Sequence, residues 1–273
     1  MLSLTLLFQE VSENLMNSLA TLLSSSVPSE ANSAQQKAYV SYTISSLSST
    51  TATIPPTITL LEARSLLAAG GTTGLRTWEA AFHLGQYLCL PDTRPLIEGK
   101  AVLELGAGTG YVAILCAKHL GASHVIATDG SDEVVADMPT NFYLNGLEDS
   151  SSIVAKDLFW GQALMGGEES EWNGGRNIDV VLGADITFDA SVIPSLVATI
   201  SDLFELYPSL QVIISATIRN ETTFRKFLDV CRIRKFEVQD IEFPILPLSE
   251  QHGPFYSDAT PIRLCNISRS TQG

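Results

Sequence analysis

The chain has 273 residues, of which 16 are basic and 30 acidic, so its formal net charge is −14. Hydrophobic residues make up 45% of the chain and charged residues only 17%, which excludes a fully disordered protein, because disorder requires low hydrophobicity and dense charge. The acidic balance argues against nucleic acid as the main partner, since phosphate binding needs clustered Lys and Arg. It suits an enzyme whose partner presents a basic group.

Neither a membrane span nor a targeting sequence is predicted. No stretch reaches the roughly 20 apolar residues that cross a bilayer, and the apolar start lacks the basic residues of a signal peptide or mitochondrial presequence. The four cysteines and four histidines show no metal-ligand or disulfide spacing. We therefore expect a cytosolic monomer without a metal site.

The first 57 residues differ in character from the rest. Apolar positions between residues 4 and 23 recur at helical spacing, and a Ser/Thr-rich stretch follows as far as Pro55 and Pro56, which predict a turn. We interpret residues 1–57 as an extension, with a docking helix and a connector, that packs beside a larger domain over residues 58–273.

From about residue 100, short apolar runs alternate with segments of 3.6-residue periodicity. Strands are predicted at 101–105, 124–128, 152–155, 180–184, 211–216, 236–243 and 262–267. Helices are predicted at 111–120, 133–144, 192–206 and 221–233, and a surface loop at 166–177. This alternation predicts an α/β fold with a parallel sheet covered on both faces. The last two strands could form an antiparallel pair at its edge.

The sharpest motif follows the predicted strand 101–105 and opens the next helix. It reads Glu104-Leu105-Gly106-Ala107-Gly108-Thr109-Gly110. Glycine there permits a tight turn and lets a ligand approach backbone N–H groups at a helix N-terminus. A dinucleotide fingerprint needs Gly or Ala where this chain has Tyr111, and the Gly-Lys-Ser/Thr of a phosphate loop is missing. What remains resembles the first motif of class I S-adenosylmethionine-dependent methyltransferases.

A second signal is Asp129, at the end of the next predicted strand. A carboxylate there can accept both ribose hydroxyl protons, and open α/β sheets bind ligands at the C-terminal ends of their strands. Glu104 or Asp129 alone could equally be a strand-end acid that caps a loop. Together, about 20 residues apart, the glycine loop and the acid favour a nucleoside-type cofactor.

Three further segments narrow the resemblance. They run over residues 71–81 (GTTGLRTWEAA), 157–161 (DLFWG) and 181–189 (VLGADITFD). With the glycine loop they resemble the seven-β-strand lysine methyltransferases of eukaryotes, most closely the branch that modifies translation elongation factor 2. The resemblance covers about residues 58–267. It implies a Rossmann-like seven-stranded class I methyltransferase sheet, S-adenosylmethionine as the cofactor, and a protein lysine as the substrate.

The resemblance also implies roles for single positions. The implied cofactor contacts are Trp78, Glu104, Gly106, Ala107, Gly108, Asp129, Trp160 and Ala184. Trp78 would also border the substrate channel, and Trp160 would flank the adenine. Asp185 and Phe188 form the family's Asp-x-x-Phe/Tyr motif at the target lysine and are the candidate catalytic residues. Many relatives carry Tyr at the last position, so Phe188 lacks a hydroxyl that could bind the amine.

Elementary chemistry is consistent with these roles. A sulfonium methyl group is already activated, so the protein must mainly align a neutral amine with it. Free lysine has a pKa of roughly 10.4, which an aromatic, water-poor channel lowers by desolvation. Asp185 could orient the ammonium, and Phe188 and Trp78 could form aromatic walls. Plainer interpretations exist as well: core packing for Trp78 and Phe188, a cover for the sheet edge for Trp160, and a helix cap for Asp185.

Two other classes of function remain open at this point. One is a methyltransferase of nucleic acid or of a small molecule. Amino-methylating nucleic-acid enzymes carry Asn/Asp-Pro-Pro-Tyr/Phe after the fourth strand, where this chain has no prolines over residues 185–188. The other is a non-catalytic binding module, against which the intact glycine loop, Asp129 and Asp185 argue. We expect a protein partner, elongation factor 2, and neither nucleic acid nor membrane.

Overall fold

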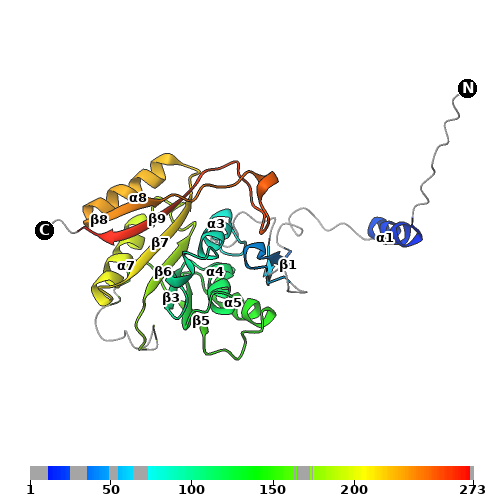
Figure 1. Ribbon diagram of the computed structural model, residues 1–273, viewed down its shortest axis with the longest axis horizontal. Coiled ribbons are helices and arrows are strands. Elements are labelled where there is room, and N and C mark those ends of the chain that lie inside the picture. The colour runs from blue at the N-terminus through cyan, green and yellow to red at the C-terminus, as the bar shows by residue number, and fades with distance from the viewer. Residues whose placement is uncertain are drawn as a thin grey trace, which may run out of the picture.

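The computed structural model describes residues 12–24, 36–48, 55–63, 73–162, 164, 173 and 175–270. At its centre lies a seven-stranded sheet in the order β5-β4-β3-β6-β7-β9-β8, with helices on both faces (Figure 1). The strands are β3 (Ala101–Leu105), β4 (His124–Asp129), β5 (Ile153–Asp157), β6 (Val180–Ala184), β7 (Gln211–Thr217), β8 (Phe236–Ile241) and β9 (Ile262–Arg269). The predicted Rossmann-like α/β fold is confirmed.

Two helical layers cover this sheet. One face carries α3 (Glu79–Leu88), α4 (Tyr111–Lys118) and α5 (Asp132–Leu144), and the other carries α7 (Ile193–Leu206) and α8 (Glu221–Ile233). Successive residues of a strand point to opposite faces, so Val102 packs in the first core and Leu103 in the second. Strands buried on both faces read as continuous apolar runs, which is why the sequence predicts them.

The edge of the sheet differs from a purely parallel arrangement. Strands β5, β4, β3, β6 and β7 are parallel neighbours, whereas β9 pairs antiparallel with both β7 and β8. The predicted antiparallel pair is therefore confirmed. The sequence does not predict the order of the strands at this edge. Strand β9 lies between β7 and β8, although β8 precedes it in the chain.

A hairpin precedes this sheet in the chain and packs against helices α4 and α5. Strand β1 (Ala38–Thr43) pairs antiparallel with β2 (Thr57–Glu62), and Ile44, Ile58 and Leu60 are buried in the core beneath α4 and α5. The residue after α5 helps to hold β2: the Asn145 amide donates to the carbonyl of Thr59 at 2.7 Å. The expected boundary between residues 57 and 58 therefore falls inside a hairpin that belongs to the domain, because both strands share its core.

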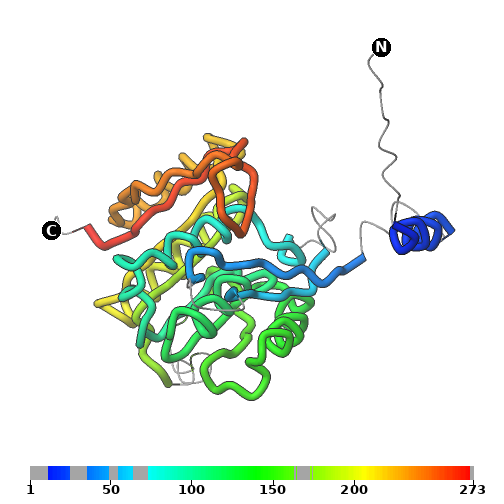
Figure 2. The backbone as a smooth tube through the Cα atoms, turned by 45° about the vertical axis from the view of Figure 1, so that its right-hand side comes forward, coloured from blue at the N-terminus to red at the C-terminus, as the bar shows by residue number. Residues whose placement is uncertain are grey.

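The N-terminal helix stands apart. Helix α1 (Glu13–Ser24) forms within the stretch of predicted helical spacing, but none of its residues is buried, and Figure 2 shows it away from the hairpin and the sheet. The expected docking is thus not seen for these residues, whose leucines face solvent; residues 4–11 lie outside the described part. Of the predicted loop 166–177, only 173 and 175–177 are described, and Asn173 is buried.

No helix in the described ranges combines the length and the apolar character that a membrane crossing requires.

Candidate active site

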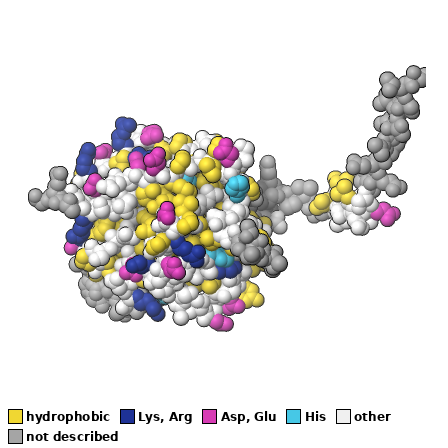
Figure 3. Space-filling view, viewed as in Figure 1, with side chains coloured by type: hydrophobic (Ala, Val, Ile, Leu, Met, Phe, Trp, Pro, Cys, Tyr) yellow, Lys and Arg dark blue, Asp and Glu magenta, His cyan; other side chains and the backbone are white. Residues whose placement is uncertain are grey.

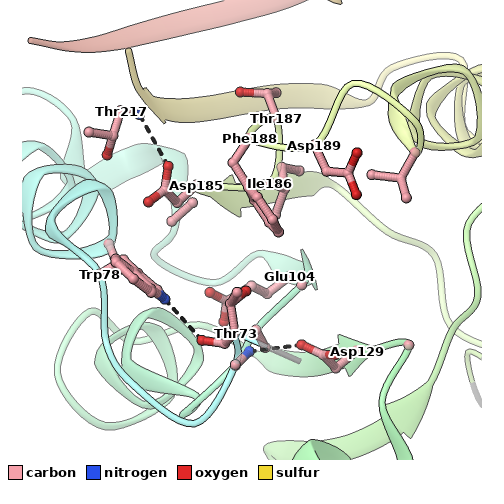
Figure 4. A pocket seen from close by; sticks show the side chains of 18 of the residues that line it. Thr73, Trp78, Glu104, Asp129, Asp185, Ile186, Thr187, Phe188, Asp189 and Thr217 are labelled. Carbon is pink, nitrogen blue, oxygen red and sulfur yellow. Dashed lines mark hydrogen bonds between the residues drawn. The ribbon is translucent and has the colours of Figure 1, made fainter. Parts of the chain in front are cut away.

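A cavity of about 680 Å³ opens at the C-terminal ends of the central strands. It lies where β4 and β6 flank β3 on opposite sides, the point of strand-order reversal at which open α/β sheets bind ligands. All ten residues predicted from the sequence line it: Trp78, Glu104, Gly106, Ala107, Gly108, Asp129, Trp160, Ala184, Asp185 and Phe188. In Figure 4, Asp129 lies toward one end and Asp185 with Trp78 toward the other, with Glu104 between them.

The glycine loop takes a conformation that needs glycine. Gly106, Gly108 and Gly110 have φ angles of 65°, 54° and 80°, in the left-handed region that side chains disfavour. A Cβ atom at Gly106 would also lie 2.7 Å from the Cγ2 atom of Ile186. The loop thus fits closely under the segment that follows β6, and its backbone remains open to the cavity.

The two strand-end acids cap backbone groups and line the cavity at the same time. Glu104, which is 2% exposed, accepts a hydrogen bond from the Ala113 N–H at 2.8 Å, and burial raises the pKa of this carboxyl to about 8. Asp129 accepts from the N–H groups of Gly108 and Ser131, each at 3.1 Å. Burial raises the pKa of Asp129 as well. Each carboxylate oxygen has a second lone pair, so capping leaves Asp129 able to accept ribose hydroxyls.

The Asp129 end of the cavity fits an adenosyl group. The volume of the whole cavity is within the usual range of small-molecule sites, about 300–1,000 Å³. The indole N–H of Trp160 is buried without a partner among the described residues, and its ring lies beside Gly106, where a Cβ atom would meet the Trp160 Cζ2 atom at 3.3 Å. A buried donor needs an acceptor, which a purine ring nitrogen or another polar atom of such a ligand can supply.

Asp185 occupies the opposite end in a strained backbone conformation. It follows Ala184 at the end of β6 and has a φ angle of 59°, which is uncommon for a residue with a side chain. Its side chain is 7% exposed; it accepts from the Thr217 N–H at 3.3 Å and lies 2.8 Å from Nη1 of Arg219. Burial raises the pKa of Asp185, while the Arg219 guanidinium opposes that rise.

Aromatic side chains form the wall near Asp185. The half-buried Trp78 donates its indole N–H to the carbonyl of Thr73 at 2.9 Å. Two guanidinium groups lie over its ring, that of Arg76 at 4.7 Å and that of Arg219 at 4.9 Å from the ring centroid. Phe188 is 49% exposed and lines the cavity, which is not the position of a core side chain.

Arg219 and Arg76 also line the cavity, although the sequence predicts no role for either. Arg76 stands in the quoted 71–81 segment, while Arg219 belongs to no motif. The one signal for Arg219 is its position two residues after β7, at the strand ends where ligands bind in such sheets. The partner of its guanidinium is 34 positions away in the chain, at Asp185, and no local pattern reveals such a pairing.

Comparisons with known proteins agree with this geometry. A family model described as lysine methyltransferase matches residues 65–232. The chain is 54% identical over 259 residues to protein-lysine N-methyltransferase EFM3 of Chaetomium thermophilum, covering 95% of this chain and 76% of the relative. It is 33% identical over 188 residues to the Saccharomyces cerevisiae protein of the same name, covering 64% of this chain and 53%, about half, of that relative.

Among solved structures, an O-methyltransferase from Bacillus cereus in complex with SAH is similar at a TM-score of 0.47 and 14% identity, covering 71% of this chain and 83% of that chain.

Proposed function

This chain belongs to the lysine methyltransferase family and is an enzyme of that class, and we propose that it methylates a lysine of translation elongation factor 2 with S-adenosylmethionine as the donor. The observation that carries this proposal is the single cavity that joins the glycine loop and Asp129 to Asp185 and Trp78. One end fits a nucleoside, and the other offers a carboxylate and an aromatic wall to an amine.

The cofactor end holds the donor through the chain's own groups. Asp129 accepts the ribose hydroxyl protons, and the loop at Gly106 and Gly108 lets the ligand approach the backbone. Trp160 would lie beside the adenine, and its indole N–H, which has no partner among the described residues, would be available to a polar atom of the ligand. S-adenosylmethionine supplies a methyl group that is already activated by its sulfonium, so the protein needs to bind and orient more than to activate.

The substrate end accepts the lysine side chain. Trp78 and Phe188 provide aromatic surface for its aliphatic stem and its head group. Asp185 orients the nitrogen, and contact with the aromatic surface desolvates the head group, which favours the neutral amine with the lone pair that attack requires. Asp185 and Phe188 therefore act on the substrate, seven of the other predicted residues act around the cofactor, and Trp78 borders both.

Two observations support a protein substrate, and one supports elongation factor 2. The net charge is −14, and on the face drawn in Figure 3 the Lys and Arg side chains are interspersed with acidic ones, unlike a nucleic-acid interface. Both EFM3 relatives are named protein-lysine N-methyltransferases. The described part of the 71–81 segment, Thr73 to Ala81, contributes several residues to the cavity wall, and its resemblance to the elongation factor 2 branch supports that substrate. We place the reaction of this monomer in the cytosol, where translation takes place.

Methyl transfer to purified elongation factor 2 tests the proposal. We expect label from S-adenosylmethionine on a lysine, and loss of that label in Asp185→Ala with cofactor binding retained. Asp240→Ala is a matched control, because Asp240 also pairs with an arginine, Arg263, but lies outside the cavity. Cofactor binding without label on this substrate would contradict the elongation factor assignment. Absence of cofactor binding would favour a non-catalytic module.

A further inference from the structure

Arg219 contacts three residues at the substrate end. Its Nη1 atom lies 2.8 Å from Oδ2 of Asp185, which follows β6. Its Nη2 atom lies 3.5 Å from Oε2 of Glu79 at the start of α3. Its guanidinium carbon lies 4.9 Å from the ring centroid of Trp78, which precedes α3. One side chain thus contacts the predicted catalytic acid and the aromatic wall together.

The geometry fixes the Asp185 carboxylate from two sides. One oxygen faces Arg219, and the other accepts the backbone N–H of Thr217 at 3.3 Å. The acid is 7% exposed, whereas the Arg219 side chain is 40% exposed. The guanidinium therefore reaches inward from the mouth to an acid in the wall, and can be changed without opening the core.

The four charged groups joined by ion pairs at the substrate end sum to zero. Arg76 and Arg219 are positive, and Glu79 and Asp185 are negative; Glu79 bridges the two arginines at 3.2 and 3.5 Å. The other ionisable side chains that line the cavity are Asp189, toward Phe188, and Glu104, Asp129 and Tyr111, toward the glycine loop. Without a neighbouring cation, the Asp185 carboxylate would bind an ammonium and favour the protonated lysine. With the Arg219 guanidinium beside it, the carboxylate favours the protonated form much less.

We propose that Arg219 is a positioning residue for methyl transfer, which orients Asp185 and cancels its charge so that the site receives the target lysine as a neutral amine. The proposal rests on the proposed function. The ammonium loses its proton to water; the Nζ lone pair then forms the bond to the methyl carbon as the carbon–sulfur bond breaks, and that electron pair stays on sulfur. The product is a methylammonium, which Asp185 and the aromatic wall can accommodate.

Single-turnover methyl transfer by the full chain to elongation factor 2, measured from about pH 6 to about pH 10, tests this role. Single turnover isolates the bound complex, whose pH dependence reports the groups that must be deprotonated there. In Arg219→Gln we expect the midpoint of the rising limb to move up by about one pH unit. The rate of this variant should fall about tenfold at pH 7 and recover at high pH. Its KM for the protein substrate should not rise. Arg219→Lys keeps the charge and is expected to keep the midpoint.

A matched control separates this effect from the general loss of an arginine. Arg269 pairs with Glu205 at 2.6 Å and lies 5.9 Å from the Phe204 ring centroid, outside the cavity. Arg269→Gln should leave the profile unchanged, and S-adenosylhomocysteine should bind wild type and Arg219→Gln with equal affinity in calorimetry.

An unmoved midpoint in Arg219→Gln, or a rate lowered equally at every pH with a higher KM, would overturn the positioning role. Wild-type protein that binds S-adenosylhomocysteine but labels no protein would instead reject the proposed function and this role with it.

Discussion

The backbone N–H of Gly108 donates to the carboxylate of Asp129 across 3.1 Å. The glycine loop after β3 and the acid at the end of β4 are therefore one unit, and the same carboxylate that shapes the loop faces the cofactor end of the cavity. A substitution at Asp129 consequently affects both the loop and the ligand, and the two effects must be measured separately.

Asp129→Ala should weaken the binding of S-adenosylhomocysteine by about 1.5–3 kcal/mol, the scale of a hydrogen bond to a charged group, or roughly ten- to hundredfold in Kd. Isothermal titration calorimetry measures this directly. Asp179→Ala is the control, because Asp179 also accepts a backbone N–H, that of Ala101 at 2.8 Å, but lies outside the cavity. Equal affinity in wild type and Asp129→Ala would exclude the ribose role.

Gly106→Ala should destabilise the fold by about 1–3 kcal/mol, because the added methyl group meets the Cγ2 atom of Ile186 at 2.7 Å in addition to the cost of the positive φ angle. Urea unfolding gives the free energy of unfolding of each variant. Gly99→Ala provides the comparison: Gly99 has a φ of 72° but no atom within 4 Å of the added Cβ. If both variants lost the same stability, crowding at Gly106 would play no part.

In Glu104→Gln, the free energy of unfolding should decline less than in the wild type as the pH rises from 5 to 8.5. Burial raises the pKa of Glu104 from its ordinary value of 4.5 to about 8, so the folded state holds a proton that the unfolded state releases. The stability linked to this group is full below about pH 4.5 and is lost as the pH rises through about 8. Glutamine stays neutral, so its urea midpoint should fall less between pH 5 and pH 8.5.

Exposed Glu98 supplies the control for that series. Glu98→Gln should follow the wild-type decline in urea midpoint. A Glu104→Gln decline as steep as that of the wild type would show that the buried carboxyl is not the group responsible.

Phe188→Ala should reduce methyl transfer while leaving stability almost unchanged. The ring is 49% exposed and lines the substrate end, so its loss removes aromatic surface for the lysine but little core, and surface substitutions usually cost within about 0.5 kcal/mol. Steady-state kcat/KM and the melting temperature test the two halves of this expectation. Tyr143→Ala, on exposed α5 surface, should alter neither. A large drop in melting temperature would place Phe188 in the core after all.

Local sequence patterns predict much of the fold and of the site. The alternation of apolar runs with helical periodicity predicts the central strands because each strand is buried on both faces, as Val102 and Leu103 show. The glycine loop and Asp129 predict a shared site because the ends of neighbouring parallel strands meet at one edge. The hairpin of β1 and β2 is not predicted, because its two six-residue strands lie within or beside the Ser/Thr-rich stretch that is interpreted as a connector. Asn141 of α5 and Asn145 just after it hold β2 by hydrogen bonds.

By itself, the sequence determined the parallel sheet, because buried strands read as apolar runs. Its four motifs also determined the family, and the resemblance they carry implied the ten residues that line the cavity. Only the tertiary structure decided that β9 inserts between β7 and β8, that α1 leaves its leucines exposed, and that Arg219 reaches Asp185 and Trp78. These features depend on how elements distant in sequence pack against one another. The packing brings the Arg219 guanidinium to the Asp185 carboxylate, and no local sequence pattern predicts that contact.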